Sequence, residues 1–325
     1  MIKGGVLLNQ IPGVTVAEMV DLGQAAERLG YVRCWVADQG LDTRDVYVTL
    51  AAMAAMTRTI QLGPGITNPY LRHPAVSAAS IASVDELSGG RAFHGIGAGG
   101  VDTLQPMGLR HKRPVAALRE MIKTTRALYR GEVVNFKGET IQLEGARIDY
   151  GRPELEIYLA GRGQRMLNLG GELADGVMLG FIHKELLQDY IDEIRAGAAR
   201  TGNKPRLFYY AMMITDERML EAVRASAFYL LSDSPPQVRE RLGIGPAELE
   251  VIRQVMVQKG PTEAGKLIKE EWIRPFALIG SVGECVAELA GLTRRFSLDE
   301  FILPILETGT AGELLAQVAE ALPST

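Results

Sequence analysis

The stretch Ile60-Gln61-Leu62-Gly63-Pro64-Gly65-Ile66-Thr67-Asn68-Pro69-Tyr70-Leu71-Arg72-His73-Pro74 runs from a short apolar strand, through a turn rich in glycine and proline, to the start of a helix. Its first three residues predict the strand, and the helical spacing of apolar residues in Ala75–Leu87 predicts the helix. A strand, a loop and a helix in this order form the repeating unit of α/β proteins. The fold then depends on how often this unit recurs along the chain.

Apolar runs that predict strands recur eight times: Gly4–Asn9, Val32–Ala37, Ile60–Leu62, Ala92–Ile96, Leu155–Leu159, Gly176–Leu179, Leu207–Met213 and Glu300–Leu303. Nearly every run is followed by a segment of helical period, for example Val16–Leu29 and Pro114–Tyr129. Repeated units of this kind make the strands parallel, and eight parallel strands can close into a barrel. We therefore expect an α/β fold of the (β/α)8 TIM-barrel type, with a doubly wound open sheet as the alternative.

Two segments interrupt this rhythm. Val133–Phe136 and Thr140–Leu143 flank the turn Lys137-Gly138-Glu139 and predict a small hairpin. The stretch Ser232–Ile279 is irregular and predicts an insertion after the seventh strand, on the face of the barrel where active sites lie. We expect a single domain over residues 1–325 that carries both decorations.

The composition excludes several classes of protein. The chain has 325 residues, 47% of them hydrophobic, and a net charge of −4, so a large core is expected and disorder is not. Basic and acidic residues are mixed along the chain, so nucleic acid is not an expected partner. No apolar stretch reaches the length of a membrane span, and the N-terminus does not resemble a signal peptide. We expect a cytoplasmic protein in which Cys34 and Cys285 are buried thiols, although one disulfide between them is formally possible.

Loops rich in glycine follow the third, fourth and fifth predicted strands. The turn Gly63-Pro64-Gly65 fixes an unusual backbone, which suits either a platform under a planar ligand or an ordinary tight loop. Gly95-Ile96-Gly97-Ala98-Gly99-Gly100 formally fits the dinucleotide fingerprint, but it lies at the fourth strand and opens no immediate helix, so a Rossmann site is rejected. Its bare N–H groups still suit a phosphate or a planar ring.

Two further glycine clusters accompany the fifth and sixth strands: Ala160-Gly161-Arg162-Gly163-Gln164-Arg165 and Ala174-Asp175-Gly176-Val177-Met178-Leu179-Gly180. The first opens a helix and has arginines beside it, which is a good arrangement for an anion. Either cluster can also be structural turn chemistry. Because both belong to the barrel's active-site face in this interpretation, together they favour a phosphorylated ligand.

Conventional catalytic groups are sparse. The four histidines, His73, His94, His111 and His183, have no metal-ligand spacing, and two cysteines are too few for a zinc cluster, so no metal site is expected. The chain also lacks the G-x-S-x-G elbow of α/β-hydrolases. A barrel with several loops suited to phosphate and no evident acid–base set indicates that a cofactor supplies the chemistry.

Four segments together resemble the bacterial-luciferase-like superfamily: Trp35-Val36-Ala37-Asp38, Ile60–Pro74, Leu87-Ser88-Gly89-Gly90-Arg91 and Gly95–Gly100. Two more, Leu159-Ala160-Gly161-Arg162-Gly163 and Gly171-Glu172-Leu173-Ala174-Asp175-Gly176, look like the branch that uses the deazaflavin coenzyme F420 and is typified by methylenetetrahydromethanopterin reductase. The resemblance runs almost from end to end. Each motif is loose by itself, and the order and spacing of all of them make the match specific.

The resemblance implies a dimeric or higher homo-oligomeric barrel that binds F420, or FMN as the alternative, and a non-proline cis peptide at Gly65–Ile66. It also implies a cofactor ring near Asn68 and an anionic cofactor tail near Arg162 and Arg165. The cofactor-binding residues that it implies are Gly65, Ile66, Thr67, Asn68, Gly97, Ala98, Gly99, Ala160, Gly161, Arg162, Gly163, Gly176 and Val177.

Two departures concern the substrate. Many relatives carry histidine after the aspartate that ends the second strand, whereas here Gln39 follows Asp38. Relatives that act on tetrahydromethanopterin carry an acidic residue on the first strand, and Gly4–Leu8 has none. A pterin is therefore one candidate for the small-molecule substrate and does not follow from the resemblance.

The expected function is hydride transfer between F420 and a small organic substrate, with Asp38 or Gln39 bonded to the ring or the substrate. An FMN-dependent monooxygenase on the same barrel is the first alternative. A non-catalytic flavin-binding protein and a barrel for an unrelated phosphate ligand are the others. The apolar, small-residue helix Leu50–Met56 is a candidate contact with a second subunit.

Overall fold

A computed structural model describes residues 2–322 except Gln10, Pro12 and Asp233. Eight parallel strands form one sheet in the order β3-β2-β1-β12-β9-β8-β7-β4. Their bounds are β1 Lys3–Leu8, β2 Arg33–Val36, β3 Gln61–Pro64, β4 His94–Gly97, β7 Ile157–Ala160, β8 Gly176–Leu179, β9 Arg206–Tyr210 and β12 Glu300–Ile305. The end strands β3 and β4 meet through parallel bridges between Leu62 and Ala92 and between Thr67 and Ile96. The sheet is therefore closed, which confirms the predicted barrel and excludes the open sheet.

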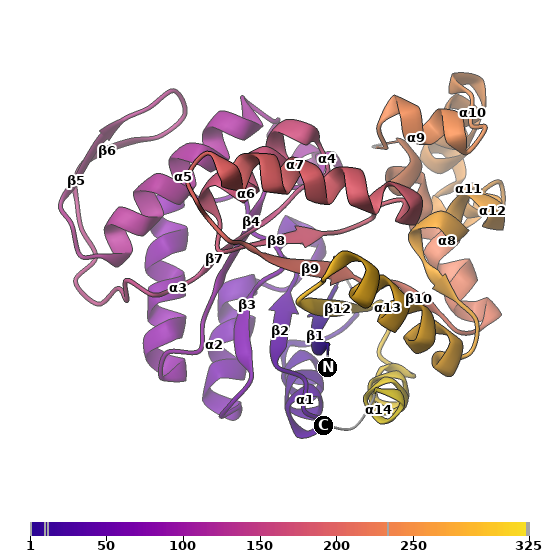
Figure 1. Ribbon diagram of the computed structural model, residues 1–325, viewed down its shortest axis with the longest axis horizontal. Coiled ribbons are helices and arrows are strands. Elements are labelled where there is room, and N and C mark those ends of the chain that lie inside the picture. The colour runs from indigo at the N-terminus through magenta and orange to yellow at the C-terminus, as the bar shows by residue number, and fades with distance from the viewer. Residues whose placement is uncertain (1, 10, 12, 233, 323–325) are drawn as a thin grey trace. The chain divides into compact units, whose positions relative to one another are not determined.

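Helices follow the strands and surround them, as Figure 1 shows. The helices of the barrel unit are α1 Val16–Arg28, α2 Val46–Met56, α3 Pro74–Ser88, α4 Val101–Leu104, α5 Pro114–Tyr129, α6 Gln164–Leu173 and α14 Ala311–Ala321. Local sequence sets where they begin. Thr15 and Glu18 form a capping box at α1, and the carboxylate of Asp45 accepts hydrogen bonds from the first N–H groups of α2.

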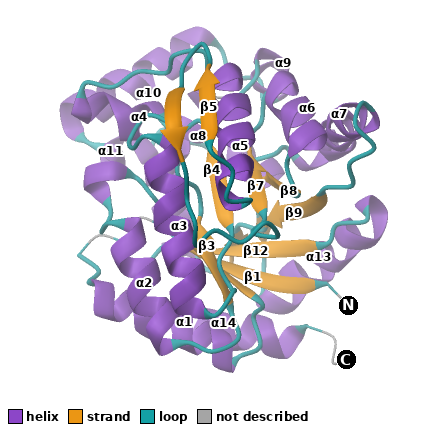
Figure 2. Cartoon of the chain, turned by 90° about the vertical axis from the view of Figure 1, so that its left-hand side faces the viewer, coloured by secondary structure: helices purple, strands orange, loops and turns teal. Residues whose placement is uncertain are grey.

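The predicted hairpin is present as β5 Val134–Lys137 and β6 Gln142–Ala146, which pair antiparallel. Its turn is held by Glu120 of α5, whose carboxylate accepts the backbone N–H groups of Glu139, Thr140 and Ile141 at 2.6–3.0 Å. Figure 2 shows the hairpin beside α5. One buried carboxylate thus anchors the hairpin to the barrel unit.

The chain forms two compact units. The barrel unit comprises residues 1–180, 190–210 and 298–325, and the second unit comprises residues 181–189 and 211–297. The second unit holds α8 Glu217–Ser232, α9 Pro236–Arg241, α10 Pro246–Lys259, α11 Pro261–Gly265, α12 Glu270–Ile273 and α13 Val282–Phe296. The predicted insertion, 232–279, lies in this unit and is largely helical. Helix α7, Leu187–Ala199, belongs partly to each unit.

The seventh strand is shorter than its apolar run predicts. It ends at Tyr210, and Met213–Ile214 forms a separate strand, β10, that pairs with β11 Leu278–Ile279 in the second unit. Residues on both sides of the break are buried. The apolar pattern is therefore continuous, and the sequence gives no signal for the place where the chain leaves the barrel.

The third strand is longer than predicted, because it continues through Gly63 and Pro64. A Cβ atom at Gly63 would overlap the carbonyl oxygen of Phe93, and one at Gly95 would overlap that of Pro64. These two glycines let β3 and β4 approach closely enough to close the barrel. Gly63 and Gly95, which look like turn residues in the sequence, are thus required within the sheet of the barrel.

Aromatic rings fill the barrel between the strands. Trp35 lies 4.4 Å from Phe93 and 5.6 Å from both Tyr158 and Phe208, measured between ring centroids. Towards the amino ends of the strands, the guanidinium of Arg33 lies 5.2–5.4 Å from three of these rings and pairs with the buried carboxylate of Glu300. The interior is therefore a packed core, and any ligand site lies at its carboxyl end.

Replacing Gly63 with alanine should destabilise the protein, because the new Cβ would overlap the backbone of β4. We expect the free energy of unfolding to fall by about 1–3 kcal/mol, the usual cost of overpacking a core. Denaturant unfolding measures it. Gly291→Ala is the matched control, since Gly291 lies in α13 with nothing within 4 Å of the new methyl group. That variant should keep or raise stability, and equal losses in both would contradict the steric explanation.

Candidate active site

The carboxyl ends of the barrel strands bring most of the predicted site residues together. Asp38 and Gln39 follow β2, and the Gly65–Asn68 segment follows β3. Thr67 is paired with β4, because its N–H donates to the carbonyl of Gly95 at 3.0 Å and its carbonyl accepts from the N–H of Gly97 at 2.9 Å. Gly97 in turn pairs with Ala160 of β7. The loops after four neighbouring strands therefore share one mouth.

Bare backbone forms the floor of this mouth. The Gly65–Ile66 peptide bond is cis, as the resemblance implies. A Cβ at Gly65 would lie 2.7 Å from side-chain atoms of both Leu7 and Trp35, and one at Gly97 would lie 2.6 Å from the side chain of Ile66. These positions accept no side chain, so the backbone here packs directly on its neighbours at the carboxyl end of the core.

Asp38 is buried and its carboxylate is already engaged. One oxygen accepts the hydroxyl of Thr67 at 2.7 Å and a guanidinium N–H of Arg72 at 2.9 Å. Arg72 also bonds Asp45 at 2.6 Å and lies over the ring of Tyr47. A carboxylate held by a cation and a hydroxyl suits positioning of the Thr67 segment better than proton transfer.

Two amide side chains at the mouth keep an unmet polar atom. Asn68 is fully buried, and its Oδ1 accepts the N–H groups of Tyr70 and Leu71 at 3.0 Å. Its Nδ2, which lies against Gly99, and the Oε1 of Gln39 are buried without a hydrogen-bond partner among the described residues. Unpaired buried polar groups are costly, so this donor and this acceptor indicate a polar ligand.

The loop after β7 presents the open end of a helix. Helix α6 begins after Gly163, and no side chain caps its first N–H groups. Gly161 packs closely on Met166, while Arg162 is half-buried and Arg165 is exposed. Uncapped N–H groups at a helix N-terminus beside arginines suit an anion.

Two predicted residues are not brought to the mouth. Gly176 and Val177 begin β8, and Gly176 pairs with Tyr158 and Arg206. Gly176 is bare because a Cβ there would overlap the ring of Phe208, which is a packing requirement. The residue that follows the carboxyl end of β8 is Gly180, the last member of the same predicted glycine cluster.

The histidines have different roles. His73 caps α3 by accepting the N–H of Ala75 at 3.2 Å. His94 is fully buried and bonded to the hydroxyl of Tyr129 at 2.9 Å, and burial lowers the pKa of its imidazole to about 3. The sequence analysis gave no role to His111, yet its Nε2 bonds the carbonyls of Ala98 and Gly99 in the predicted site.

The described residues include neither a group of metal ligands nor a helix that could cross a membrane. No group of three or more His, Cys, Asp or Glu side chains is arranged to hold a metal ion. None of the helices there combines the length and the hydropathy that crossing a bilayer requires.

The comparisons with known proteins agree with this geometry. The luciferase-like monooxygenase family model matches residues 3–298. A 5,10-methylenetetrahydromethanopterin reductase of Methanolobus tindarius is 32% identical over 86% of this chain and 87% of its own length. The Archaeoglobus fulgidus enzyme of the same name is 31% identical over 87% and 88%. The structure of the coenzyme F420-dependent tetrahydromethanopterin reductase from Methanopyrus kandleri superposes with a TM-score of 0.86 at 24% identity, covering 98% of each chain. The chain therefore belongs to the bacterial luciferase-like family, as its motifs indicated.

Proposed function

We propose that this protein is an F420-dependent oxidoreductase that transfers a hydride between the deazaflavin and a small organic substrate. The observation that carries the proposal is the pair of unmet polar atoms at the mouth, the Nδ2 of Asn68 and the Oε1 of Gln39. The pyrimidine edge of a deazaflavin alternates carbonyl acceptors with an N–H donor, so it offers a partner to each. Relatives that are 32% and 31% identical are named as methylenetetrahydromethanopterin reductases, which supports the same reading.

The other residues of the mouth have roles that fit this cofactor. The backbone at Gly65 and Gly97, where no side chain fits, suits a planar ring. The N-terminus of α6, beside Arg162 and Arg165, suits the phosphate and the acidic tail. When bound, the deazaflavin supplies a two-electron hydride donor or acceptor at C5. The protein's own contribution is to orient the ring and the substrate and to exclude water.

We assign different roles to the two predicted catalytic residues. Asp38 is a positioning residue, because its carboxylate is bonded to Thr67 and Arg72. Gln39 keeps a polar atom for the ring or the substrate. A pterin is one candidate substrate, because relatives of this chain are named as pterin reductases. However, β1, KGGVLL, lacks the carboxylate that the resemblance implies for pterin reductases. We therefore extend the candidate substrates to other small carbonyl or imine compounds.

An FMN-dependent monooxygenase is the second candidate, because the family model that matches is named for monooxygenases. A flavin-binding protein without turnover is the third. Both share the backbone floor and the anion site with the first candidate. The identity of the bound ring distinguishes the monooxygenase, and turnover distinguishes the non-catalytic protein. We place the protein in the cytoplasm, where Cys34 and Cys285, both free and buried, would stay reduced.

Equilibrium binding of F420 and of FMN to the purified protein tests the proposal. We expect F420 to bind at least tenfold more tightly than FMN, and reduced F420 to be oxidised when a substrate is supplied. The measurement is the fluorescence of each ring during titration. Tighter binding of FMN, with oxygen consumption, would identify the protein as an FMN-dependent monooxygenase. Binding of a cofactor without turnover of any donor and acceptor pair would leave only the non-catalytic flavin-binding protein.

The variant Asn68→Asp tests the role of the unmet donor. It keeps the Oδ1 acceptor for Tyr70 and Leu71, but it replaces the Nδ2 donor with a second oxygen and places a carboxyl group at a fully buried position. We expect F420 to bind at least roughly tenfold more weakly, because the donor to the ring is lost and an acceptor takes its place. Thermal unfolding of the protein without cofactor measures the separate cost of burying the carboxyl group. Unchanged affinity would show that Asn68 does not face the cofactor.

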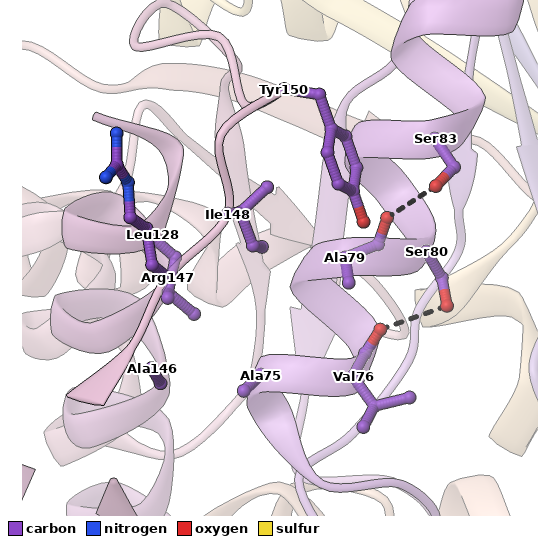
Figure 3. A pocket seen from close by; sticks show the side chains of 10 residues that line it. All are labelled: Ala75, Val76, Ala79, Ser80, Ser83, Leu128, Ala146, Arg147, Ile148 and Tyr150. Atoms are coloured by element: carbon purple, nitrogen blue, oxygen red, sulfur yellow. Dashed lines mark hydrogen bonds between the residues drawn. The ribbon is translucent and has the colours of Figure 1, made fainter. Parts of the chain in front are cut away.

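We further propose that two or more copies associate through the outer faces of α2 and α3, which pack against each other. Val48 and Met56 of α2 and Val76 of α3 are 55–59% exposed, which is high for large apolar side chains. Figure 3 shows the adjoining hollow on α3, of about 360 Å³, where Tyr150 and Ile148 face the small residues Ala79 and Ser83. A self-complementary helix pair of this kind suits a homodimer or a higher homo-oligomer.

The variant Val48→Glu should shift the protein toward the monomer, because it places a charge in the middle of this apolar face. Light scattering after gel filtration measures the mass. Val257→Glu is the control, since Val257 is 77% exposed on α10, outside the face. A monomeric wild-type protein, or equal dissociation of both variants, would contradict the proposed interface.

A further inference from the structure

One basic run remains without a role in the proposed function. It is Arg110-His111-Lys112-Arg113, which lies between the loop after β4 and the start of α5. Arg110, Lys112 and Arg113 are exposed, whereas His111 is half-buried and turns toward the site. Arg113 pairs with Glu139 of the hairpin turn, and His111 is the member of the run that contacts the predicted site.

His111 connects two of the loops that form the mouth, those after β3 and β4. Its Nε2 lies 3.1 Å from the carbonyl oxygen of Ala98 and 3.0 Å from that of Gly99. Its ring stands edge-on to Tyr70 of the loop after β3, with 5.6 Å between centroids. The hydroxyl of Tyr70 donates to the carbonyl of Lys112 at 3.1 Å. We call this set of contacts, made by His111, Tyr70, Ala98, Gly99 and Lys112, the latch.

The chemistry of the two partners fixes the proton on His111. Both Ala98 and Gly99 offer carbonyl oxygens, which only accept hydrogen bonds, so Nε2 must carry the proton. The same N–H is present in the neutral Nε2–H tautomer and in the imidazolium. The latch therefore does not depend on whether the ring is charged.

The latch determines what Asn68 can present. Gly99 has a positive φ of 76°, and a Cβ there would meet the Nδ2 of Asn68 at 3.0 Å. Backbone hydrogen bonds fix the Oδ1 of the same side chain. If Gly99 moved, the unmet donor of Asn68 would open to water. The position of the Ala98–Gly99 backbone thus sets both the shape of the mouth and the exposure of this donor.

We propose that His111 is a second positioning residue of the cofactor site, holding the Ala98–Gly99 backbone against Asn68 through its Nε2–H. The inference rests on the proposed function for its effect on cofactor affinity, while its effect on the loop stands by itself. His111 neither donates a proton to the substrate nor contacts the ring in this assignment. It acts through the carbonyls that it binds.

Two substitutions distinguish the effect of the His111 N–H donor from that of its aromatic ring. His111→Phe keeps an aromatic edge toward Tyr70 and removes the N–H. His111→Gln supplies an N–H donor from a side chain of similar reach. Arg110→Gln is the control, since it removes an exposed neighbouring charge outside the latch.

The first readout uses the protein without cofactor. Amide hydrogen exchange of residues 97–104 should speed up about tenfold in His111→Phe, as for the loss of one hydrogen bond to a buried group, and return to within about threefold of wild type in His111→Gln. Arg110→Gln should exchange as wild type does. Unchanged exchange in His111→Phe, or no rescue by glutamine, would overturn the proposal.

The second readout is the dissociation constant of F420 between pH 5.5 and 8. His111→Phe should weaken binding about tenfold with rescue by glutamine, and the wild-type affinity should show no step that disappears in the variants. Such a step would assign His111 a direct contact with the cofactor and overturn the positioning role. If neither F420 nor FMN bound, the proposed function would fail, and the exchange experiment would still decide whether the latch exists.

Discussion

The packing of strands around Trp35 is the constraint on which both the barrel and its mouth depend. A Cβ at Gly65 would lie 2.7 Å from this side chain, and one at Gly95 would lie 2.9 Å from its ring. The large ring therefore fits only where the neighbouring strands carry no side chain, and the same bare backbone lets β3 and β4 close the sheet. Packing against Trp35 thus accounts for Gly65 and Gly95, whereas the close approach of Phe93 accounts for Gly63. The mouth lies directly above this packed core.

The sequence predicted what depends on local pattern and missed what depends on distant contacts. The eight strands, the hairpin and the helix after Gly163 have apolar periods of their own, so their positions were predictable. The family resemblance placed Gly176 in the cofactor site. The sequence does not show whether this glycine lies at the amino or the carboxyl end of its strand, and the register of β8 with Tyr158 and Arg206 puts it at the amino end. His111 was missed because its partners are carbonyls 12 and 13 residues away, and a histidine in a basic run has no local signature.

Several residues of the recognised motifs hold the scaffold and do not face the mouth. Arg91 donates to the carbonyls of Ala54, Thr57 and Ile60, which fixes the start of β3. Glu172 of α6 accepts a hydrogen bond from Arg119 of α5. This bond, together with Arg200, outweighs the opposing effect of partial burial and lowers the pKa of the Glu172 carboxyl to about 2. A resemblance carried by such residues identifies the family reliably. It says less about the substrate, which meets other side chains.

One group of charged side chains, Asp38, Arg72 and Asp45, connects the mouth of the barrel to helix α2. Arg72 bridges Asp38 at the mouth and Asp45 at the start of α2, and Asp45 also accepts the first N–H groups of that helix. Desolvation opposes ionisation of Asp45, but its bonds to Val48 and Arg72 outweigh this effect and lower the pKa of the carboxyl. A single guanidinium therefore ties the Thr67 segment, through Asp38, to the N-terminus of the helix proposed to meet a second subunit. Because hydride transfer depends on orientation, a mouth held by neutralised charges suits this chemistry better than one built around a free acid.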